Sequence, residues 1–288
     1  MYGRAIARQR IHSRPVFILG HPRTGTTMLH NLLARDTSQF AYCSSFAAGF
    51  PSACLWFERF KPLLAGAPPA PILAPLSRPA RARVRPAGVV DSRRPMDNMP
   101  LSLDTPQAPG PRRSCFEIAP TEPRAPQEDE IAVNVLTAGT SPYMPLVFMN
   151  DHKSFAPYFS FRDAPPRARH RWVGAFLHFL RKLSLRAAGK RLLLKSPVHT
   201  SRVELLLALF PNAQFIYIHR DPREVFASAC HMAETTYPYM YLCDTDPAQL
   251  QEFILSQFET LWDDYARDRP PRPVRRSRHS RSAARLLR

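Results

Sequence analysis

The chain has 288 residues, enough for one large α/β domain or at most two small ones. Its formal net charge is +17, and 13 of these charges lie in two segments: 266–288 has nine Arg against one Asp, and 78–94 has six Arg against one Asp. Both segments are rich in Pro and in Ala or Ser, without a hydrophobic period or interleaved aromatic residues. The positive charge therefore does not indicate a domain that stacks nucleic-acid bases on aromatic side chains, and no specific nucleic-acid partner is predicted.

Membrane spans, secretion signals and metal sites have no support in the sequence. No stretch is apolar for long enough to cross a bilayer, and the basic residues in 1–14 are not followed by an apolar core. The five cysteines are scattered and form no C-x-x-C pair, which predicts reduced thiols and no metal site. The compartment stays open, with the cytoplasm as the default expectation.

The first predicted element is a short buried strand over 15–19. In the loop that follows, Gly20 and Gly25 have the outer spacing of a phosphate-binding loop, and an amphipathic helix is predicted over 28–34. The order of strand, glycine loop and helix directs backbone N–H groups and a helix N-terminus at an anion. The alternative is a strand-to-helix turn that binds no ligand.

The loop differs at one position from that of Mg-nucleotide enzymes. Those enzymes place a Lys before the final hydroxyl, where it reaches the outer phosphates. Here that residue is Thr26, and the cation of the loop is Arg23. Such a loop suits a donor whose transferred group carries less charge. A P-loop kinase or nucleotide hydrolase is the alternative, but it needs a loop Lys and a metal-holding Asp after a strand, and neither is evident in the sequence.

The region after the first helix is predicted to supply an apolar surface. Residues 40–64 are rich in aromatic side chains and are interpreted as a helical segment that either lines a substrate site or belongs to the core. Periodicity is lost over about 65–95 and again over 108–125, which predicts two irregular, disordered insertions.

Three adjacent acids, Glu128, Asp129 and Glu130, precede a helix-like run over 131–136. A carboxylate at this place could serve as a general base, an effect of about 10²- to 10⁴-fold on rate. The alternative is that the acids only interact with the dipole at the helix N-terminus. Both interpretations stay open on the residues alone.

Helices and strands alternate in the C-terminal half. The predicted elements are a helix over 167–185, a strand over 190–195, a helix over 201–210, a strand over 214–219 and two helices starting near Pro222 and Asp246. This alternation implies a parallel sheet with ligands at the carboxyl ends of the strands. The predicted organisation is an N-terminal extension over 1–14, one domain over 15–266 and a disordered Arg/Pro-rich tail over 267–288.

Two cations lie where these predicted strands end. Lys195 closes the strand over 190–195, and Arg220 follows the strand over 214–219. Each is a candidate ligand for an anion. Lys195 could instead be a solvated strand terminus, and Arg220 could form a plain ion pair with Asp221 at a helix start.

Three motifs in this order resemble those of the sulfotransferase family, in the branch with a Pro-Arg-Ser/Thr-Gly-Thr-Thr loop. They are Gly20–Thr27, Leu194–Thr200, and Ile218–Pro222 with Ser228 eight residues after Arg220. The resemblance covers about 15–60 and 128–266. It implies a P-loop-like three-layer α/β fold with a central parallel sheet flanked by helices. It also implies a donor, 3′-phosphoadenosine 5′-phosphosulfate (PAPS), whose sulfuryl group passes in line to an alcohol, phenol or amine without a metal.

The resemblance further implies a set of site residues. Those expected to bind the donor are Pro22, Arg23, Thr24, Gly25, Thr26 and Thr27 at the 5′-phosphosulfate, and Arg220 and Ser228 at the 3′-phosphate. Those expected to be catalytic are Glu128 as general base, Lys195 on the bridging oxygen and Arg23 on the leaving phosphate. Asp129 and Glu130 are rivals of Glu128. His21 and His199 are alternatives near the donor, unless they only cap or pack.

The acceptor is not specified beyond a small molecule, a lipid or a carbohydrate. The aromatic residues of 40–64 favour an apolar or lipid-like alcohol. A further alternative is a non-catalytic, basic interaction protein on a truncated sulfotransferase scaffold, since family members continue into more structure after the last helix.

Overall fold

Four short parallel strands organise the part of the chain that the structure describes. The computed structural model describes residues 2–57 and 123–269, which belong to one compact unit. The predicted insertion over 65–95 lies outside the described residues, as do the insertion over 108–125 up to residue 122 and the predicted tail beyond residue 269.

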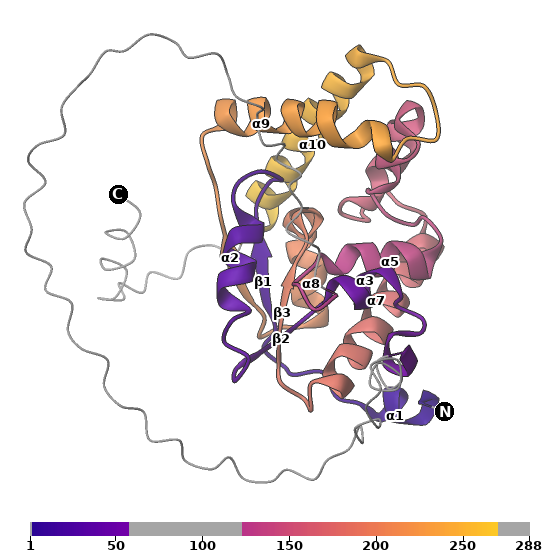
Figure 1. The fold of residues 1–288 in the computed structure, drawn as a ribbon, viewed down its shortest axis with the longest axis vertical. Coiled ribbons are helices and arrows are strands. Elements are labelled where there is room, and N and C mark those ends of the chain that lie inside the picture. Colours follow the sequence, from indigo (N-terminus) through magenta and orange to yellow (C-terminus); the bar gives the residue numbers. More distant parts are fainter. Residues whose placement is uncertain (1, 58–122, 270–288) are drawn as a thin grey trace, which may run out of the picture. The chain divides into compact units, whose positions relative to one another are not determined.

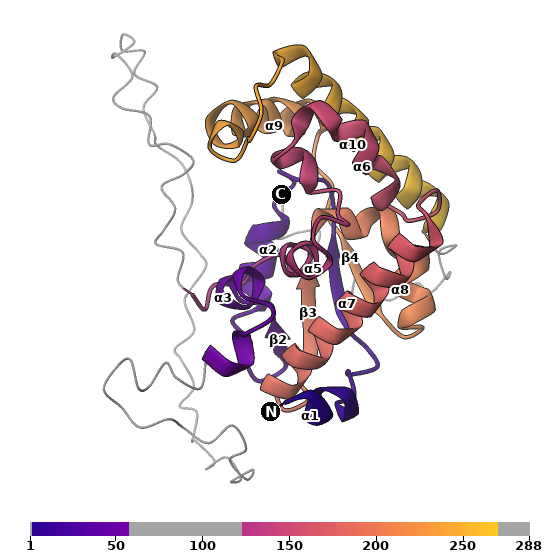
Figure 2. The same ribbon diagram turned by 90° about the vertical axis from the view of Figure 1, so that its right-hand side faces the viewer.

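The strands are β1 (Val16–Leu19), β2 (Phe40–Tyr42) and β3 (Arg191–Lys195), labelled in Figure 1, and β4 (Gln214–Tyr217), labelled in Figure 2. They lie in the order β2-β3-β1-β4, and every neighbouring pair is parallel. The predictions of β1, β3 and β4 are confirmed. The prediction of a helix from residue 40 is wrong at its start, where β2 forms an edge strand, because three residues are too few to show an alternating pattern.

The register of the sheet brings three strand ends to one edge. Ile18 of β1 pairs with Lys195, the last residue of β3. Leu19 pairs with Tyr217, the last residue of β4. The segments that follow β1, β3 and β4 therefore leave the sheet side by side, and these are the segments that carry the three sequence motifs.

Helices cover both faces of the sheet. On one face, α2 (Thr26–Leu33) packs on β1 and β3 through Leu29 and Leu33. On the other, α7 (Pro166–Arg186) packs on β2 and β3, and α5 (Asp129–Thr137) lies against α7 (Figure 2). The predicted α/β class with a central parallel sheet between helices is thus confirmed.

The remaining helices complete this unit. They are α1 (Gly3–Arg8), α3 (Ser45–Gly49), α6 (His152–Phe155), α8 (Val203–Leu209), α9 (Pro222–Thr236), α10 (Pro247–Asp268) and the 3₁₀ segments η1 (Met144–Leu146), η2 (Met149–Asp151), η3 (Ala156–Tyr158), η4 (Pro197–Arg202) and η5 (Tyr237–Tyr239). Helix α1 falls in the predicted N-terminal extension and packs on α7 with Ile6 buried.

Side-chain caps start the two long C-terminal helices. Asp221 accepts a hydrogen bond from the N–H of Arg223 at 2.8 Å, and Asp246 accepts one from Ala248 at 2.9 Å. A proline occupies the first position of each helix, as the sequence predicts. Because only four residues separate the end of β4 from the start of α9, the first turn of α9 lies at the carboxyl edge of the sheet.

Candidate active site

The loop after β1 has the backbone of an anion-binding turn. Gly20 and Gly25 have φ values of +144° and +96°, and Gly25 is the N-cap of α2. The N–H of Gly20 donates to Oγ1 of Thr200 at 2.9 Å, which ties the loop to η4. The first turn of α2 contains no acidic residue, so its N-terminus favours an anionic ligand.

Gly20→Ala is expected to destabilise the protein more than Gly25→Ala. A Cβ on Gly20 would lie 2.5 Å from the carbonyl oxygen of Ile218 and 2.9 Å from Oγ1 of Thr24, whereas one on Gly25 would meet open space. Both substitutions add strain at positive φ, but only the first adds overpacking, which typically costs about 1–3 kcal/mol. Urea unfolding midpoints of the two variants measure the difference in stability. Equal losses of stability would show that the close approach of Gly20 to the carbonyl of Ile218 does not add to the cost of the substitution.

Arg23 connects the loop to α9. Its Nε donates to Oγ of Ser228 at 2.9 Å, and its Nη1 lies 3.9 Å from Sδ of Met232. Arg23 has φ = +74°, a conformation uncommon for residues other than glycine that is often found at functional sites. The structure therefore brings together two residues of the predicted donor site that are 205 positions apart in sequence.

Arg220 lies at the same edge of the sheet but has another partner. Its Nε pairs with Oε2 of Glu224 at 2.6 Å, and its side chain is 48% exposed. An exposed pair of this kind contributes little to stability and exchanges readily with other ligands. Arg220 also lines a cavity of about 1100 Å³, together with His21 and Thr24 of the loop and aromatic residues of α10. The loop and Arg220 thus border one cavity.

Glu128, Lys195, Thr27 and Tyr143 form a second group, here called the carboxylate cluster. Nζ of Lys195 donates to Oε1 of Glu128 at 2.6 Å and to Oγ1 of Thr27 at 3.2 Å. The hydroxyl of Tyr143 donates to Oε2 of Glu128 in a short hydrogen bond. The side chain of Lys195 is buried and that of Glu128 is 20% exposed. The cluster therefore joins the first two motifs to one of the three candidate acids.

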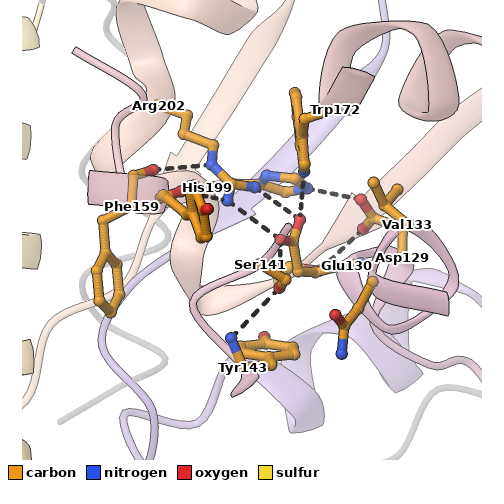
Figure 3. Close-up of polar contacts among 12 residues, drawn as sticks. Asp129, Glu130, Val133, Ser141, Tyr143, Phe159, Trp172, His199 and Arg202 are labelled. Carbon is orange, nitrogen blue, oxygen red and sulfur yellow. Dashed lines mark hydrogen bonds and ion pairs between the residues drawn. The ribbon is translucent and has the colours of Figure 1, made fainter. Parts of the chain in front are cut away.

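The other two acids point into the protein interior (Figure 3). Asp129 accepts hydrogen bonds from His199 at 2.6 Å and from Ser196 at 3.2 Å. Glu130 pairs with Arg202 at 2.6 Å and accepts hydrogen bonds from Ser141 and Trp172. Both side chains are fully buried. An acceptor has no access to either of them, which leaves Glu128 as the accessible carboxylate of the three.

The geometry of α5 explains this separation. Glu128 is the N-cap residue and has extended backbone angles, whereas Asp129 and Glu130 belong to the first helical turn. The N–H of Glu130 donates to Oγ of Ser196, the residue after β3. The start of α5 is thereby fixed against the end of β3, and Glu128 is brought to Lys195.

The two histidines given as alternatives, His21 and His199, make packing and backbone contacts. His199 is fully buried, and its ring lies edge-on to Phe17 with centroids 5.5 Å apart. Nδ1 of His21 donates a hydrogen bond to the carbonyl of Pro22 at 2.8 Å, and burial lowers the pKa of the His21 ring. These contacts match the packing and capping roles that the sequence left open.

Charges near Asp129 shape its ionisation. Burial opposes the charged form, but His199 and the hydrogen bonds to the carboxylate outweigh it, so the pKa of Asp129 lies below its ordinary value. On α2, burial and the positive charge of Lys195 lower the pKa of His30 to about 4. His30 is therefore neutral at pH 7, and the positive charge beside Glu128 is that of Lys195.

Sequence reasoning missed Tyr143 and Arg202. Arg202 is fully buried, and its guanidinium lies over the rings of Trp172 and Phe161 at 4.3 and 4.9 Å. No periodic pattern marks either residue, because Tyr143 lies between short irregular turns and Arg202 ends a 3₁₀ segment. The one sequence feature that could have indicated a structural role for Arg202 is its place at the end of the polar run 199–202, directly before an apolar helix.

Two absences hold for the ranges 2–57 and 123–269. None of the helices there combines the length and apolar character needed to cross a bilayer. Within the same ranges, no three His, Cys, Asp or Glu side chains gather closely enough to hold a metal ion.

Comparisons with known proteins identify the family of this chain. Residues 15–275 match the pattern of the Sulfotransferase family. The chain is 30% identical over 262 residues to the omega-hydroxy-beta-dihydromenaquinone-9 sulfotransferases Stf3 of Mycobacterium bovis and Mycobacterium tuberculosis, a match that covers 91% of this chain and 56% of each relative. The chain thus spans about half the length of these relatives.

Solved structures share the fold. The crystal structure of sulfotransferase STF1 from Mycobacterium tuberculosis has a TM-score of 0.56 and that of STF9 from Mycobacterium avium a TM-score of 0.57, both at 19% identity. The similarity covers 93% of this chain and 61% and 58% of those chains. On its sequence match and its fold, the chain belongs to the sulfotransferase family.

Proposed function

We propose that this chain transfers a sulfuryl group from PAPS to the hydroxyl group of an apolar, lipid-like acceptor. The observation that carries the proposal is the position of Lys195, whose Nζ contacts both Thr27 of the loop and the accessible carboxylate of Glu128. The ammonium group of Lys195 thus lies between the loop that would bind the anionic donor and the carboxylate that would act as base. Transfer of a sulfuryl group from a bound donor to a hydroxyl needs these three groups close together.

In this proposal the loop holds the 5′ end of the donor. The backbone N–H groups from Arg23 to Thr27 and the Arg23 guanidinium would bind the phosphosulfate, and Lys195 would neutralise the charge that develops on the leaving phosphate oxygen. Arg220 and Ser228 would bind the 3′-phosphate. The shared cavity beside the loop and Arg220 supports this, as does the contact of Arg23 with Ser228.

The base in this proposal is Glu128. It would accept the proton of the acceptor hydroxyl while the acceptor oxygen bonds to sulfur and the bond from sulfur to the phosphate oxygen breaks. Its partial exposure distinguishes it from Asp129 and Glu130. The protein would contribute orientation and charge stabilisation.

An apolar acceptor is supported by the segment that leads into Glu128. The carbonyl of Cys43 accepts a hydrogen bond from the N–H of Gln127 at 2.8 Å, so the region around α3 lies next to the base. Phe50, Trp56 and Phe57 in this region are 56%, 49% and 44% exposed. The relatives named above act on a menaquinone derivative, and we extend that acceptor class, a lipid alcohol, to this chain.

Ligand-induced thermal stabilisation tests the donor. The desulfated product, 3′-phosphoadenosine 5′-phosphate, is expected to raise the melting temperature with or without a chelator. At 100 times its Kd the gain in unfolding free energy is about 2.7 kcal/mol. Transfer of labelled sulfate from PAPS to a long-chain alcohol then tests the reaction. Stabilisation by Mg-ATP alone would instead support the kinase alternative.

Arg220→Ala is expected to weaken binding of the desulfated product about 10- to 100-fold, since a charge-assisted hydrogen bond to the 3′-phosphate is lost. Isothermal titration of wild type and variant measures this. Adenosine 5′-phosphosulfate, which lacks the 3′-phosphate, is the matched control and should bind both proteins equally. An equal loss for both ligands would place Arg220 elsewhere on the nucleotide.

A further inference from the structure

Both oxygens of the Glu128 carboxylate are occupied in the structure. Oε1 accepts from Lys195 at 2.6 Å, and Oε2 accepts from the Tyr143 hydroxyl. Burial and the negative charge of Glu128 raise the pKa of Tyr143 well above its ordinary value, so the hydroxyl stays protonated and remains a donor. Each oxygen of this carboxylate therefore already accepts one hydrogen bond before an acceptor binds.

Tyr143 is held in place independently of Glu128. Its backbone N–H donates to Oγ of Ser141 at 3.3 Å, and that hydroxyl donates to Oε1 of the buried Glu130 at 2.7 Å (Figure 3). Glu130 in turn pairs with the fully buried Arg202. The Tyr143 backbone is therefore anchored in the protein interior, which limits the positions its hydroxyl can take.

Lys195 is the exchangeable partner of the two. Its ammonium group already contacts Thr27 at the N-terminus of α2, where a bound anion would compete with Glu128 for it. A lysine ammonium has three donors and a flexible stem, so it can turn toward the loop without a change in the backbone. Tyr143 has no second acidic partner in the carboxylate cluster and would keep its hydrogen bond.

We propose that Tyr143 is a positioning residue for the base. It holds Oε2 of Glu128 so that Oε1, released when Lys195 turns to the bound donor, faces the acceptor and takes its proton. In that step the O–H bond of the acceptor breaks and its proton moves to Oε1. The acceptor oxygen bonds to sulfur, and the phosphate leaves with the electron pair of the S–O bond. This inference rests on the proposed function.

A double-mutant cycle tests it. Tyr143→Phe keeps the ring and removes the hydrogen bond, and it is expected to lower kcat about 10- to 100-fold with little change in the donor KM. In a Glu128→Gln background the same substitution should change kcat less than about twofold, since its effect passes through the carboxylate. Tyr158→Phe, which removes a hydroxyl outside the cluster, is the matched control and should leave kcat unchanged.

The outcomes distinguish a positioning role of Tyr143 from a role in the fold or in donor binding. Equal effects of Tyr143→Phe in both backgrounds, or an unchanged kcat, would overturn the inference. A loss of stabilisation by the desulfated product in Tyr143→Phe would also overturn it, because the residue would then support the fold or the donor site. If wild-type protein transfers no sulfate to any alcohol, the proposed function fails; if it does and Tyr143→Phe is unaffected, only the inference fails.

Discussion

Glu128→Gln is expected to lower kcat for sulfuryl transfer about 10²- to 10⁴-fold, the usual contribution of a general base. Gln keeps the size of the side chain and an oxygen that can accept from Lys195 or Tyr143, but it cannot take a proton at neutral pH. Binding of the donor should be retained. In this variant Lys195 loses its anionic partner. The desulfated product should therefore bind to the variant at least as tightly as it binds to the wild-type protein.

Single-turnover rates and titration calorimetry measure these two quantities separately. Glu224→Gln is a matched control, since it also removes a carboxylate next to a cation but lies on the exposed face of α9; it should leave the rate of transfer intact. If Glu128→Gln turns over at the wild-type rate, the base is another group. If donor binding is lost instead, Glu128 serves to place Lys195 rather than to move a proton.

Arg202→Met is expected to destabilise the protein by about 3–5 kcal/mol, because it leaves the charge of Glu130 buried without a partner. Arg202 is fully buried and pairs with Glu130 through two nitrogens at 2.6 and 3.1 Å. It also donates to the carbonyls of Phe159 and Tyr158, both at 2.8 Å. A loss of this size is a large part of the 5–15 kcal/mol that typically stabilises a domain.

Adding Glu130→Gln to Arg202→Met should recover part of this loss. Gln removes the uncompensated charge and keeps one oxygen that can accept a hydrogen bond from Ser141 or Trp172. Urea unfolding of the single and double variants measures the recovery, and Arg220→Ala, which breaks an exposed ion pair, should leave the midpoint almost unchanged. A double variant less stable than Arg202→Met would mean that the hydrogen bonds of Glu130 matter more than its charge.

The strands and the loop that carry the proposed donor site could be predicted from local sequence. The buried strands β1 and β3 are short apolar runs, and a glycine at each end of the loop permits the positive φ values that it adopts. The edge strand β2 could not be predicted, because it is only three residues long and half-buried throughout. Its pairing with β3 depends on the position of the sheet and not on its own pattern.

The three adjacent acids show where prediction from sequence stops. Successive residues at a helix start point in directions about 100° apart, so Glu128, Asp129 and Glu130 meet different parts of the protein. Two of them face His199 and Arg202 in the interior, and one faces Lys195 at the edge of the sheet. Composition and spacing carry no information about which neighbour each direction meets.

The linear order of residues was enough to establish the α/β class, the phosphate-loop geometry and the resemblance to sulfotransferases, since these depend on hydrophobic runs and on backbone freedom within a few positions. The contacts of Glu128 with Lys195 and of Arg23 with Ser228, across 67 and 205 positions, required the folded chain. The parallel register of the strands and the hydrogen bond from the start of α5 to Ser196, the residue after β3, contribute to this arrangement. Both join segments that are distant in sequence.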